Sequence, residues 1–252
     1  MLDSLSLAGR RALVTGASRG LGAAIAVGLA RAGADVAVHG NTRPGDDTCA
    51  SVRAAGRRAA AIMGDLADPR TPERLVAGAI AALGGLEILV NNAGLIRRGP
   101  AEDTTDEDWN TVIEVDLSSV FRLCRAAGRH MLSAGGGKII SVASLLSFQG
   151  GIRVPAYAAA KSGVAALTRA LANEWAGRGV NVNAIAPGYM RTDNTVALRE
   201  DPDRNRQILE RIPAGRWGEP EDLVGAAVFL ASRASDYVQG HVLVVDGGWM
   251  GR

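Results

Sequence analysis

Residues 15–22 read Thr-Gly-Ala-Ser-Arg-Gly-Leu-Gly, and this glycine-rich stretch decides the fold of the chain. It follows a short apolar run at residues 11–15 and opens a helical pattern over residues 21–32. Glycines here permit a tight turn and let backbone N–H groups approach a pyrophosphate at the positive end of the helix. The spacing Gly-x-x-x-Gly-x-Gly departs from the common dinucleotide fingerprint, but its place between a first strand and a first helix favours a nucleotide site over an ordinary turn. The candidate cofactor residues in this loop are Gly16, Ser18, Arg19, Gly20, Leu21 and Gly22.

Short apolar runs alternate with longer helical patterns along the whole chain. The runs are continuous, as in strands that helices cover on both faces. Repetition of strand, helix and strand predicts an α/β fold with a doubly wound parallel sheet. We expect strands at residues 11–15, 35–39, 59–63, 88–91, 138–142, 181–185 and 241–245. We expect helices at residues 21–32, 46–55, 72–83, 107–131, 156–177 and 219–231.

The composition excludes several classes of protein. With 252 residues, of which 47% are hydrophobic and 21% charged, the chain can bury the core of one large α/β domain, so we expect a single domain over residues 1–252. The net charge is only +2, and no run of basic residues is longer than two, which argues against nucleic-acid binding. No apolar run approaches the roughly 18 to 20 residues of a membrane span, and the first residues lack the pattern of a signal peptide.

The two cysteines, Cys49 and Cys124, stand far apart, with neither CxxC nor His-paired spacing. We therefore expect no disulfide framework and no metal site. Reduced thiols fit a cytoplasmic protein. Residues 187–216 break the strand and helix rhythm with scattered polar side chains and weak helical character. A segment of that length in a compact domain predicts a functional lid over a substrate.

The end of the second strand indicates which nicotinamide cofactor is used. An acid there would bond the ribose 2′-OH and repel a 2′-phosphate, but the chain has Gly40 and Asn41 followed by Arg43. Arg19 and Arg43 can pair with a 2′-phosphate, so NADP is the preferred cofactor and NAD the alternative. After the third strand, Asp65 and Leu66 are candidates for adenine contacts, with helix capping as the alternative role of Asp65.

A second group of residues points to chemistry at the same edge of the sheet. Asn91, Asn92, Ala93 and Gly94 follow the fourth strand, and Ser144 follows the fifth. Tyr157 and Lys161 lie four residues apart in a helical pattern, so they share a face. Oxidation of an alcohol by hydride transfer also requires a base for the hydroxyl proton. A free tyrosine is a poor base at neutral pH, but a neighbouring ammonium favours its phenolate form.

Taken together, TGASRGLG, NNAG, Ser144 and YAAAK resemble the short-chain dehydrogenase/reductase family over about residues 7–248. The resemblance implies a Rossmann-type sheet of seven parallel strands, a homotetramer or homodimer, and a catalytic Asn, Ser, Tyr and Lys set. Ser144, Tyr157 and Lys161 match that set. The loop that contacts the nicotinamide in the family resembles residues 187–192 here, with Thr192 at the carboxamide position. Cofactor residues implied in this way are Tyr157, Lys161, Pro187, Gly188, Met190 and Thr192.

The family's catalytic asparagine is replaced by Asp116 in this chain. The resemblance implies that the position supplies mainly a backbone carbonyl that holds a water in the relay to the lysine, and aspartate still supplies one. A carboxylate near Lys161 would alter the proton relay, because an opposite charge raises the pKa of a lysine. We count Asp116 among the catalytic candidates.

Residues 94–98, 144–155 and 211–218 resemble sugar-acid dehydrogenases within this family, those of the gluconate and deoxygluconate kind. Such a substrate needs a cation for its carboxylate and hydrogen-bond partners for its hydroxyls. We therefore expect an enzyme that moves hydride between the cofactor and a secondary alcohol or ketone of gluconate, 2-deoxygluconate or 2-keto-3-deoxygluconate. The substrate candidates are Ser144, Tyr157, Gln149, Arg153, Arg97, Arg98 and Asn194.

Two other functions stay open. A 3-oxoacyl thioester reductase would share TGASRGLG, and Arg122, Arg125 and Arg129 could dock an acidic carrier protein. A non-enzymatic dinucleotide-binding subunit is the alternative from another class, with Asp116 marking lost chemistry. The apolar residues 242–245, together with Trp249, predict a buried contact between subunits.

Overall fold

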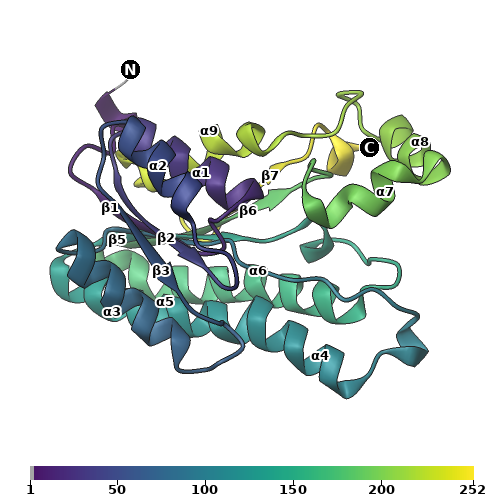
Figure 1. The fold of residues 1–252 in the computed structure, drawn as a ribbon, viewed down its shortest axis with the longest axis horizontal. Helices are drawn as coiled ribbons and strands as arrows, with labels where there is room; N and C mark the ends of the chain where they lie inside the picture. The colour runs from purple at the N-terminus through teal and green to yellow at the C-terminus, as the bar shows by residue number, and fades with distance from the viewer. Residues whose placement is uncertain (1–2) are drawn as a thin grey trace.

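The computed structural model describes residues 3–252, and its centre is one parallel sheet of seven strands in the order β3-β2-β1-β4-β5-β6-β7 (Figure 1). This confirms the predicted Rossmann-type, doubly wound sheet, and β2 and β3 lie on the other side of β1 from β4–β7. In such sheets ligands bind where the strand order reverses, outside the carboxyl ends of the strands. The strands are β1 Arg11–Val14, β2 Asp35–Gly40, β3 Ala59–Met63, β4 Ile88–Asn91, β5 Gly137–Val142, β6 Val180–Pro187 and β7 Val242–Val245.

Helices cover both faces of the sheet (Figure 1). Helices α1, α2 and α9 lie on one face, and α3, α4, α5 and α6 lie on the other. The α-helices are α1 Gly20–Arg31, α2 Asp46–Ala54, α3 Thr71–Leu83, α4 Asp106–Ile113, α5 Ser119–Ala134, α6 Pro155–Trp175, α7 Val196–Glu200, α8 Pro202–Arg211 and α9 Val224–Ala231. Short 3-10 turns are Asp3–Leu5, Ala101–Asp103, Leu145–Ser147, Ala176–Arg178, Asp193–Thr195, Pro220–Leu223, Arg233–Ser235 and Trp249–Gly251. Within residues 3–252, no helix is both long and apolar enough to cross a membrane.

The single helix expected over residues 107–131 is wrong in one respect. The segment Glu114–Ser118 is a π-helical turn between α4 and α5. The hydroxyl of Ser119, the first residue of α5, donates to the backbone oxygen of Val115 in this turn at 2.6 Å. A π-turn is frequent at functional sites because the wider turn redirects its side chains, and this one contains the buried Asp116. A periodicity of 3.6 residues cannot reveal such an insertion.

The segment at residues 187–216 has more structure than its sequence predicts. Helix α8 lies where weak helical character was expected, and α7 precedes it. The carboxylate of Asp201 accepts from the backbone N–H groups of Asp203 and Arg204 at 3.0 Å and so caps α8. Figure 1 shows α7 and α8 together at one end of the molecule, near the C-terminus.

Trp249 does not need a second subunit to be buried. It is 6% exposed within the chain itself and belongs to a small apolar cluster with Ile208, Ile212 and Trp217. Its ring lies 4.6 Å from that of Tyr189, and the guanidinium of Arg211 covers it at 4.0 Å. Packing within the chain therefore accounts for the burial of Trp249, and the subunit contact stays a prediction.

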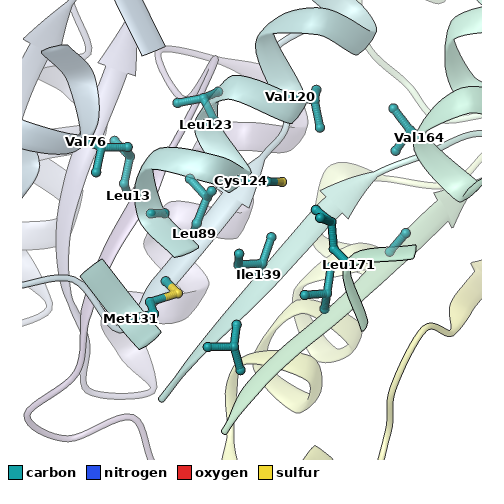
Figure 2. Close-up of a cluster of buried hydrophobic side chains, with 14 of the residues drawn as sticks. Leu13, Val76, Leu89, Val120, Leu123, Cys124, Met131, Ile139, Val164 and Leu171 are labelled. Carbon is teal, nitrogen blue, oxygen red and sulfur yellow. The ribbon is translucent and has the colours of Figure 1, made fainter. Parts of the chain in front are cut away.

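Each face of the sheet has its own apolar core. The core under α3, α5 and α6 contains large aliphatic side chains from strands and helices alike, as Figure 2 shows for Leu13, Leu89, Leu123 and Ile139. The core on the other face packs α1 and α9 against the sheet through residues such as Ile25. Burial on both faces explains why the strands read as continuous apolar runs.

The contact between α5 and α6 depends on a glycine. A β-carbon at Gly128 would stand 2.7 Å from the indole ring of Trp175. We expect Gly128→Ala to lower the free energy of unfolding by about 1–3 kcal/mol, because overpacking displaces the ring. Gly78→Ala in α3 is the matched control, since its β-carbon would meet Ile62 at an ordinary 3.6 Å and alanine favours a helix. Urea unfolding measures the free energy of unfolding of both variants. Equal values for the two would contradict the role of Gly128 in the contact between α5 and α6.

Candidate active site

A cleft of about 560 Å³ runs along the carboxyl edge of the sheet. The cleft is lined by the glycine loop after β1, the ends of β2 and β3, the loop after β4, α6 and the segment after β6. Most of the residues expected at a cofactor line this one cleft. They are Gly16, Ser18, Arg19, Gly20, Leu21, Asn41, Arg43, Asp65, Leu66, Asn92, Ala93, Gly94, Tyr157, Lys161 and Thr192.

The glycine loop is held against the end of β4. A β-carbon on Gly22 would overlap the carbonyl oxygen of Gly16 and the side-chain nitrogen of Asn92. The amide Nδ2 of Asn92 donates to the carbonyl oxygens of Thr15 and Gly16 at 2.9 and 3.0 Å. Gly16 and Gly20 have φ of 60° and 57°, the left-handed region that favours glycine. The loop therefore requires glycine both for its turn and for this close approach.

The start of α1 offers the donors that a pyrophosphate needs. The residue before its first turn is Arg19, whose side chain has no acceptor for the free N–H groups of that turn. The turn borders the cleft through Gly20 and Leu21. The cleft thus has a helix N-terminus with unsatisfied donors, a glycine cradle and two nearby arginines, Arg19 and Arg43. These features fit a dinucleotide phosphate.

His39 is a cleft residue that the sequence analysis missed. The imidazole is 1% exposed, and it accepts from the backbone N–H of Gly16 on Nδ1 at 3.2 Å. Its Nε2 lies 2.9 Å from the carbonyl oxygen of Gly64, to which it can only donate. Both bonds together require the neutral ring. Burial lowers the pKa of His39, against the opposing effects of the Gly64 carbonyl and Asp65. This side chain ties the glycine loop to the ends of β2 and β3.

The end of the cleft near β2 and β3 is tightly folded. A β-carbon on Gly40 would overlap the carbonyl oxygen of Arg43, so glycine is needed for the turn that brings Arg43 to the cleft. Asp65 accepts from the backbone N–H of Ala67 at 3.0 Å and from Asn41 at 3.3 Å. Asp65 therefore holds the turn after β3, but the helix-capping alternative is wrong, because α3 begins at Thr71 and the residue before it is Arg70. Asp65 also lines the cleft.

Tyr157 and Lys161 project from α6 into the same cleft. Nζ of Lys161 donates to the backbone oxygen of Val142 at 2.9 Å and lies 5.4 Å from the centre of the Tyr157 ring. Ser144 begins the turn after β5, and its hydroxyl accepts from the N–H of Leu146 at 3.2 Å. Ser147, which the sequence analysis did not single out, accepts from the N–H of Ser144 and donates to the carbonyl oxygen of Lys161 at 2.7 Å. Ser147 therefore fixes the Ser144 turn to the helix that carries Lys161.

Asp116 forms a buried ion pair with Lys161. The two side chains are 0% and 5% exposed, and Oδ2 of Asp116 lies 3.4 Å from Nζ of Lys161. The other carboxylate oxygen accepts from the N–H of Leu95 at 2.8 Å. Burial raises the pKa of Asp116, against the opposing attraction of Lys161 and the Leu95 N–H. Burial alone would lower the pKa of Lys161, but the neighbouring Asp116, together with the Tyr157 side chain, outweighs it and holds the pKa above its ordinary 10.5. Lys161 thus remains an ammonium throughout the neutral range.

Six residues expected at the cofactor do not line the cleft. Gly22 and Gly40 act through the close packing described above. The Asn91 side chain is buried and donates to Ser141 of β5 at 3.1 Å and to the Cys124 sulfur of α5 at 3.3 Å. A β-carbon on Gly188 would stand 2.6 Å from Cα of Asp246. Pro187 ends β6 and Met190 is buried in the core.

The substrate candidates are spread around the cleft rather than gathered in it. Asn194 lines the cleft, and its backbone oxygen accepts from Arg98 at 3.2 Å. Arg97 pairs with Asp108 at 3.2 Å, and Gln149 accepts from the indole of Trp249 at 3.2 Å. Five of the candidates do not line the cleft: Arg97, Arg98, Ser144, Gln149 and Arg153.

Arg153 has an unusual backbone. Its φ is 63°, and no other non-glycine residue among residues 3–252 has a positive φ. Its carbonyl oxygen accepts from the N–H of Gly99 at 3.1 Å, which joins the loop before α6 to the loop after β4. Strain of this kind persists where the surrounding structure imposes it, often at a binding site.

Comparisons with known proteins give the relatives of this chain. The profile of a family described as enoyl-(acyl carrier protein) reductase matches residues 16–250. The 2-dehydro-3-deoxy-D-gluconate 5-dehydrogenase of Escherichia coli K12 is 52% identical over 253 residues, with 100% of each chain covered.

Two solved structures extend the comparison. One from Agrobacterium tumefaciens, provisionally described as a 2-deoxy-D-gluconate 3-dehydrogenase with bound NADP, is 54% identical with a TM-score of 0.94, and the match covers 99% of this chain and 100% of the other. A gluconate 5-dehydrogenase from Burkholderia cenocepacia J2315, in complex with NADP and tartrate, is 38% identical with a TM-score of 0.94, covering 99% and 98%.

The neutral His39 makes stability depend on pH. The unfolded imidazole takes up a proton near its ordinary pKa of 6.5, whereas the folded one must first break its bond to Gly16. Stability should therefore fall as the pH drops below about 6.5, by up to about 1.4 kcal/mol per pH unit for this group. Urea unfolding between pH 5 and pH 8 should show a shallower slope for His39→Asn. The exposed His241→Asn is the control, and identical slopes for wild type and His39→Asn would contradict this role.

Proposed function

Because this chain belongs to the short-chain dehydrogenase/reductase family, we propose that it is an oxidoreductase that binds NADP in preference to NAD and acts on a sugar acid. The observation that carries the proposal is the single cleft that contains the glycine loop together with Tyr157 and Lys161. A cofactor bound there and a proton-transfer group are the two requirements of alcohol oxidation.

The cofactor assignment rests on chemistry at both ends of the cleft. Two arginines, Arg19 and Arg43, line it, and the end of β2 carries no acid that would repel a 2′-phosphate. NADP is also named with the two solved relatives. Thr192 lines the other end, where we assign it to the carboxamide. NAD is the alternative cofactor, because Asn41 can still bond an unphosphorylated ribose.

The proposed mechanism assigns one role to each residue. The bound nicotinamide would accept the hydride from the alcohol carbon, or return it to a ketone. Tyr157 takes the hydroxyl proton as the hydride leaves, and Ser144 holds the substrate oxygen. Lys161 keeps its charge beside the Tyr157 ring through Asp116, and favours the phenolate form. The proton then passes from Tyr157 through Lys161 to water, and it follows the reverse route when a ketone is reduced.

A sugar acid fits the polar residues around the cleft. Asn194 supplies an amide inside it, while Arg98 and Arg153 lie on the two loops that the Gly99 bond joins. A guanidinium on these loops can bind the substrate carboxylate. The dehydrogenase names of the relatives point to gluconate, 2-deoxygluconate or 2-keto-3-deoxygluconate as the substrate. We assign residues 187–216 as the lid that closes over it.

A 3-oxoacyl thioester reductase is supported less well. The arginines that would dock an acidic carrier are already paired within the chain. Arg122 pairs with Glu114, and Arg125 and Arg129 lie 3.6 and 3.5 Å from Glu73. A non-enzymatic role conflicts with the presence of Tyr157, Lys161 and Asp116 around the cleft. A cytoplasmic location and a homotetramer or homodimer stay predictions.

The proposed activity predicts a specific loss in Tyr157→Phe. We expect turnover of one of D-gluconate, 2-deoxy-D-gluconate or 2-keto-3-deoxy-D-gluconate, faster with NADP than with NAD. Removal of the phenolic oxygen should lower that rate by about 10²–10⁴-fold, the usual contribution of general acid or base catalysis. The exposed Tyr237→Phe is the matched control. Reduction of a 3-oxoacyl thioester with no turnover of the three sugar acids would overturn the substrate class.

The Asp116 and Lys161 pair predicts a change in the pH profile. Without the carboxylate, burial should dominate and lower the pKa of Lys161. Asp116→Asn should therefore move the alkaline decline of the turnover number to lower pH, by about one to three units. Asparagine keeps the acceptor for Leu95. The control Glu114→Gln removes a charge from the same π-turn, and its profile should match that of the wild type. An unshifted alkaline limb in Asp116→Asn would contradict the role of the pair.

A further inference from the structure

The cleft is bridged by an ion pair that the proposed function does not use. Nη1 of Arg19, in the glycine loop, lies 2.5 Å from Oδ2 of Asp193, and both residues line the cleft. They are 174 positions apart in the sequence. Asp193 directly follows Thr192, so the pair joins the phosphate end of the cleft to the segment over its other end. Arg19 is the residue assigned to the 2′-phosphate of NADP.

This pair is easily exchanged. The two side chains are 60% and 68% exposed, and exposed pairs contribute little to stability. A phosphate carries more charge than a carboxylate and accepts two parallel bonds from a guanidinium. A 2′-phosphate that reaches Arg19 should therefore displace Asp193. An unphosphorylated ribose offers no such anion and leaves the pair intact.

The backbone around Asp193 is held independently of this pair. The hydroxyl of Thr195 donates to the carbonyl oxygen of Met190 at 2.7 Å and accepts from the N–H of Thr192 at 3.2 Å. Arg98 bonds the carbonyl oxygen of Asn194. The Asp193 side chain can thus release Arg19 while the surrounding turn keeps its shape. A substitution at Asp193 should test the charge and not the fold.

We propose that Asp193 is a specificity-determining residue, a carboxylate that competes with the 2′-phosphate of NADP for Arg19. The inference rests on the proposed role of Arg19 in the NADP site. Binding of NADP must break the pair between Arg19 and Asp193, and the free energy of that pair is lost from the binding free energy of NADP. Binding of NAD leaves the pair intact, so the pair does not change the affinity for NAD. The ratio of the two affinities is therefore set by a residue of the lid segment as well as by the glycine loop and the end of β2.

The test measures the dissociation constants of NADPH and NADH by fluorescence titration of the full-length protein, without substrate. Asp193→Asn should tighten NADPH binding about two- to fivefold, the equivalent of a weak surface pair, and change NADH binding by less than twofold. The matched control is Asp203→Asn, which removes the same charge from α8, where Asp203 pairs with Arg206 at 2.9 Å. This control should change neither constant.

Arg19→Gln separates the inference from its premise. It should weaken NADPH binding at least tenfold and leave NADH binding nearly unchanged, and an equal effect on both cofactors would show that the assignment of Arg19 is wrong. In the Arg19→Gln background, Asp193→Asn should have no further effect on NADPH. If it still tightens NADPH there, the carboxylate acts through its general field and the proposed competition is overturned. The proposal also fails if Asp193→Asn in the wild-type background leaves the NADPH to NADH ratio unchanged.

Discussion

Gly22 lies where any β-carbon would overlap the carbonyl oxygen of Gly16 and the side chain of Asn92. This contact presses the first turn of α1 against the end of β4, and it joins strands on either side of the point where the sheet order reverses. The backbone polar groups of the glycine loop have side-chain partners. Asn92 donates hydrogen bonds to two loop carbonyls, and His39 accepts one from the Gly16 N–H. The cleft therefore has rigid walls because a backbone turn, an amide and a neutral imidazole interlock.

The part of the cleft that contains Lys161 is constrained by a buried ion pair. An ammonium and a carboxylate, at 5% and 0% exposure, are costly in the interior unless they pair. Oδ2 of Asp116 faces Nζ of Lys161 at 3.4 Å without accepting a hydrogen bond from any described residue, and each group makes one further hydrogen bond. Lys161 bonds the Val142 carbonyl, and Asp116 bonds the Leu95 N–H. The π-turn brings Asp116 to this position, and Gly94 provides the space, since a β-carbon there would stand 2.8 Å from the carboxylate. The carboxylate of Asp116 is thus accommodated as an ion pair with Lys161.

Most of the fold was predictable, because continuous apolar runs have one common cause, burial on both faces of a sheet. The predicted runs differ from the strands by no more than two residues at either end, as in β6 Val180–Pro187. The glycine loop, Tyr157 and Lys161 were also found, since each depends on local spacing. The Asn91 side chain lies outside the cleft while Asn92 lines it, because adjacent positions at a strand end point to opposite sides. Helix α7 is too short to show a periodicity that distinguishes it from irregular chain, and the π-turn has none that distinguishes it from an ordinary helix.

By itself, the sequence determined the class of sheet, the edge at which the site lies and the residue types available for chemistry, because these follow from local periodicity and from glycine conformation. Only the tertiary structure decided which polar groups meet. His39 with Gly16 and Gly64, Ser147 with Lys161, and Arg19 with Asp193 are all contacts between segments that are separate in the chain. The pattern within any one segment carries no information about its partner. Hydrogen bonds and ion pairs across the cleft depend instead on how the loops at the carboxyl edge are brought together by the strands beneath them.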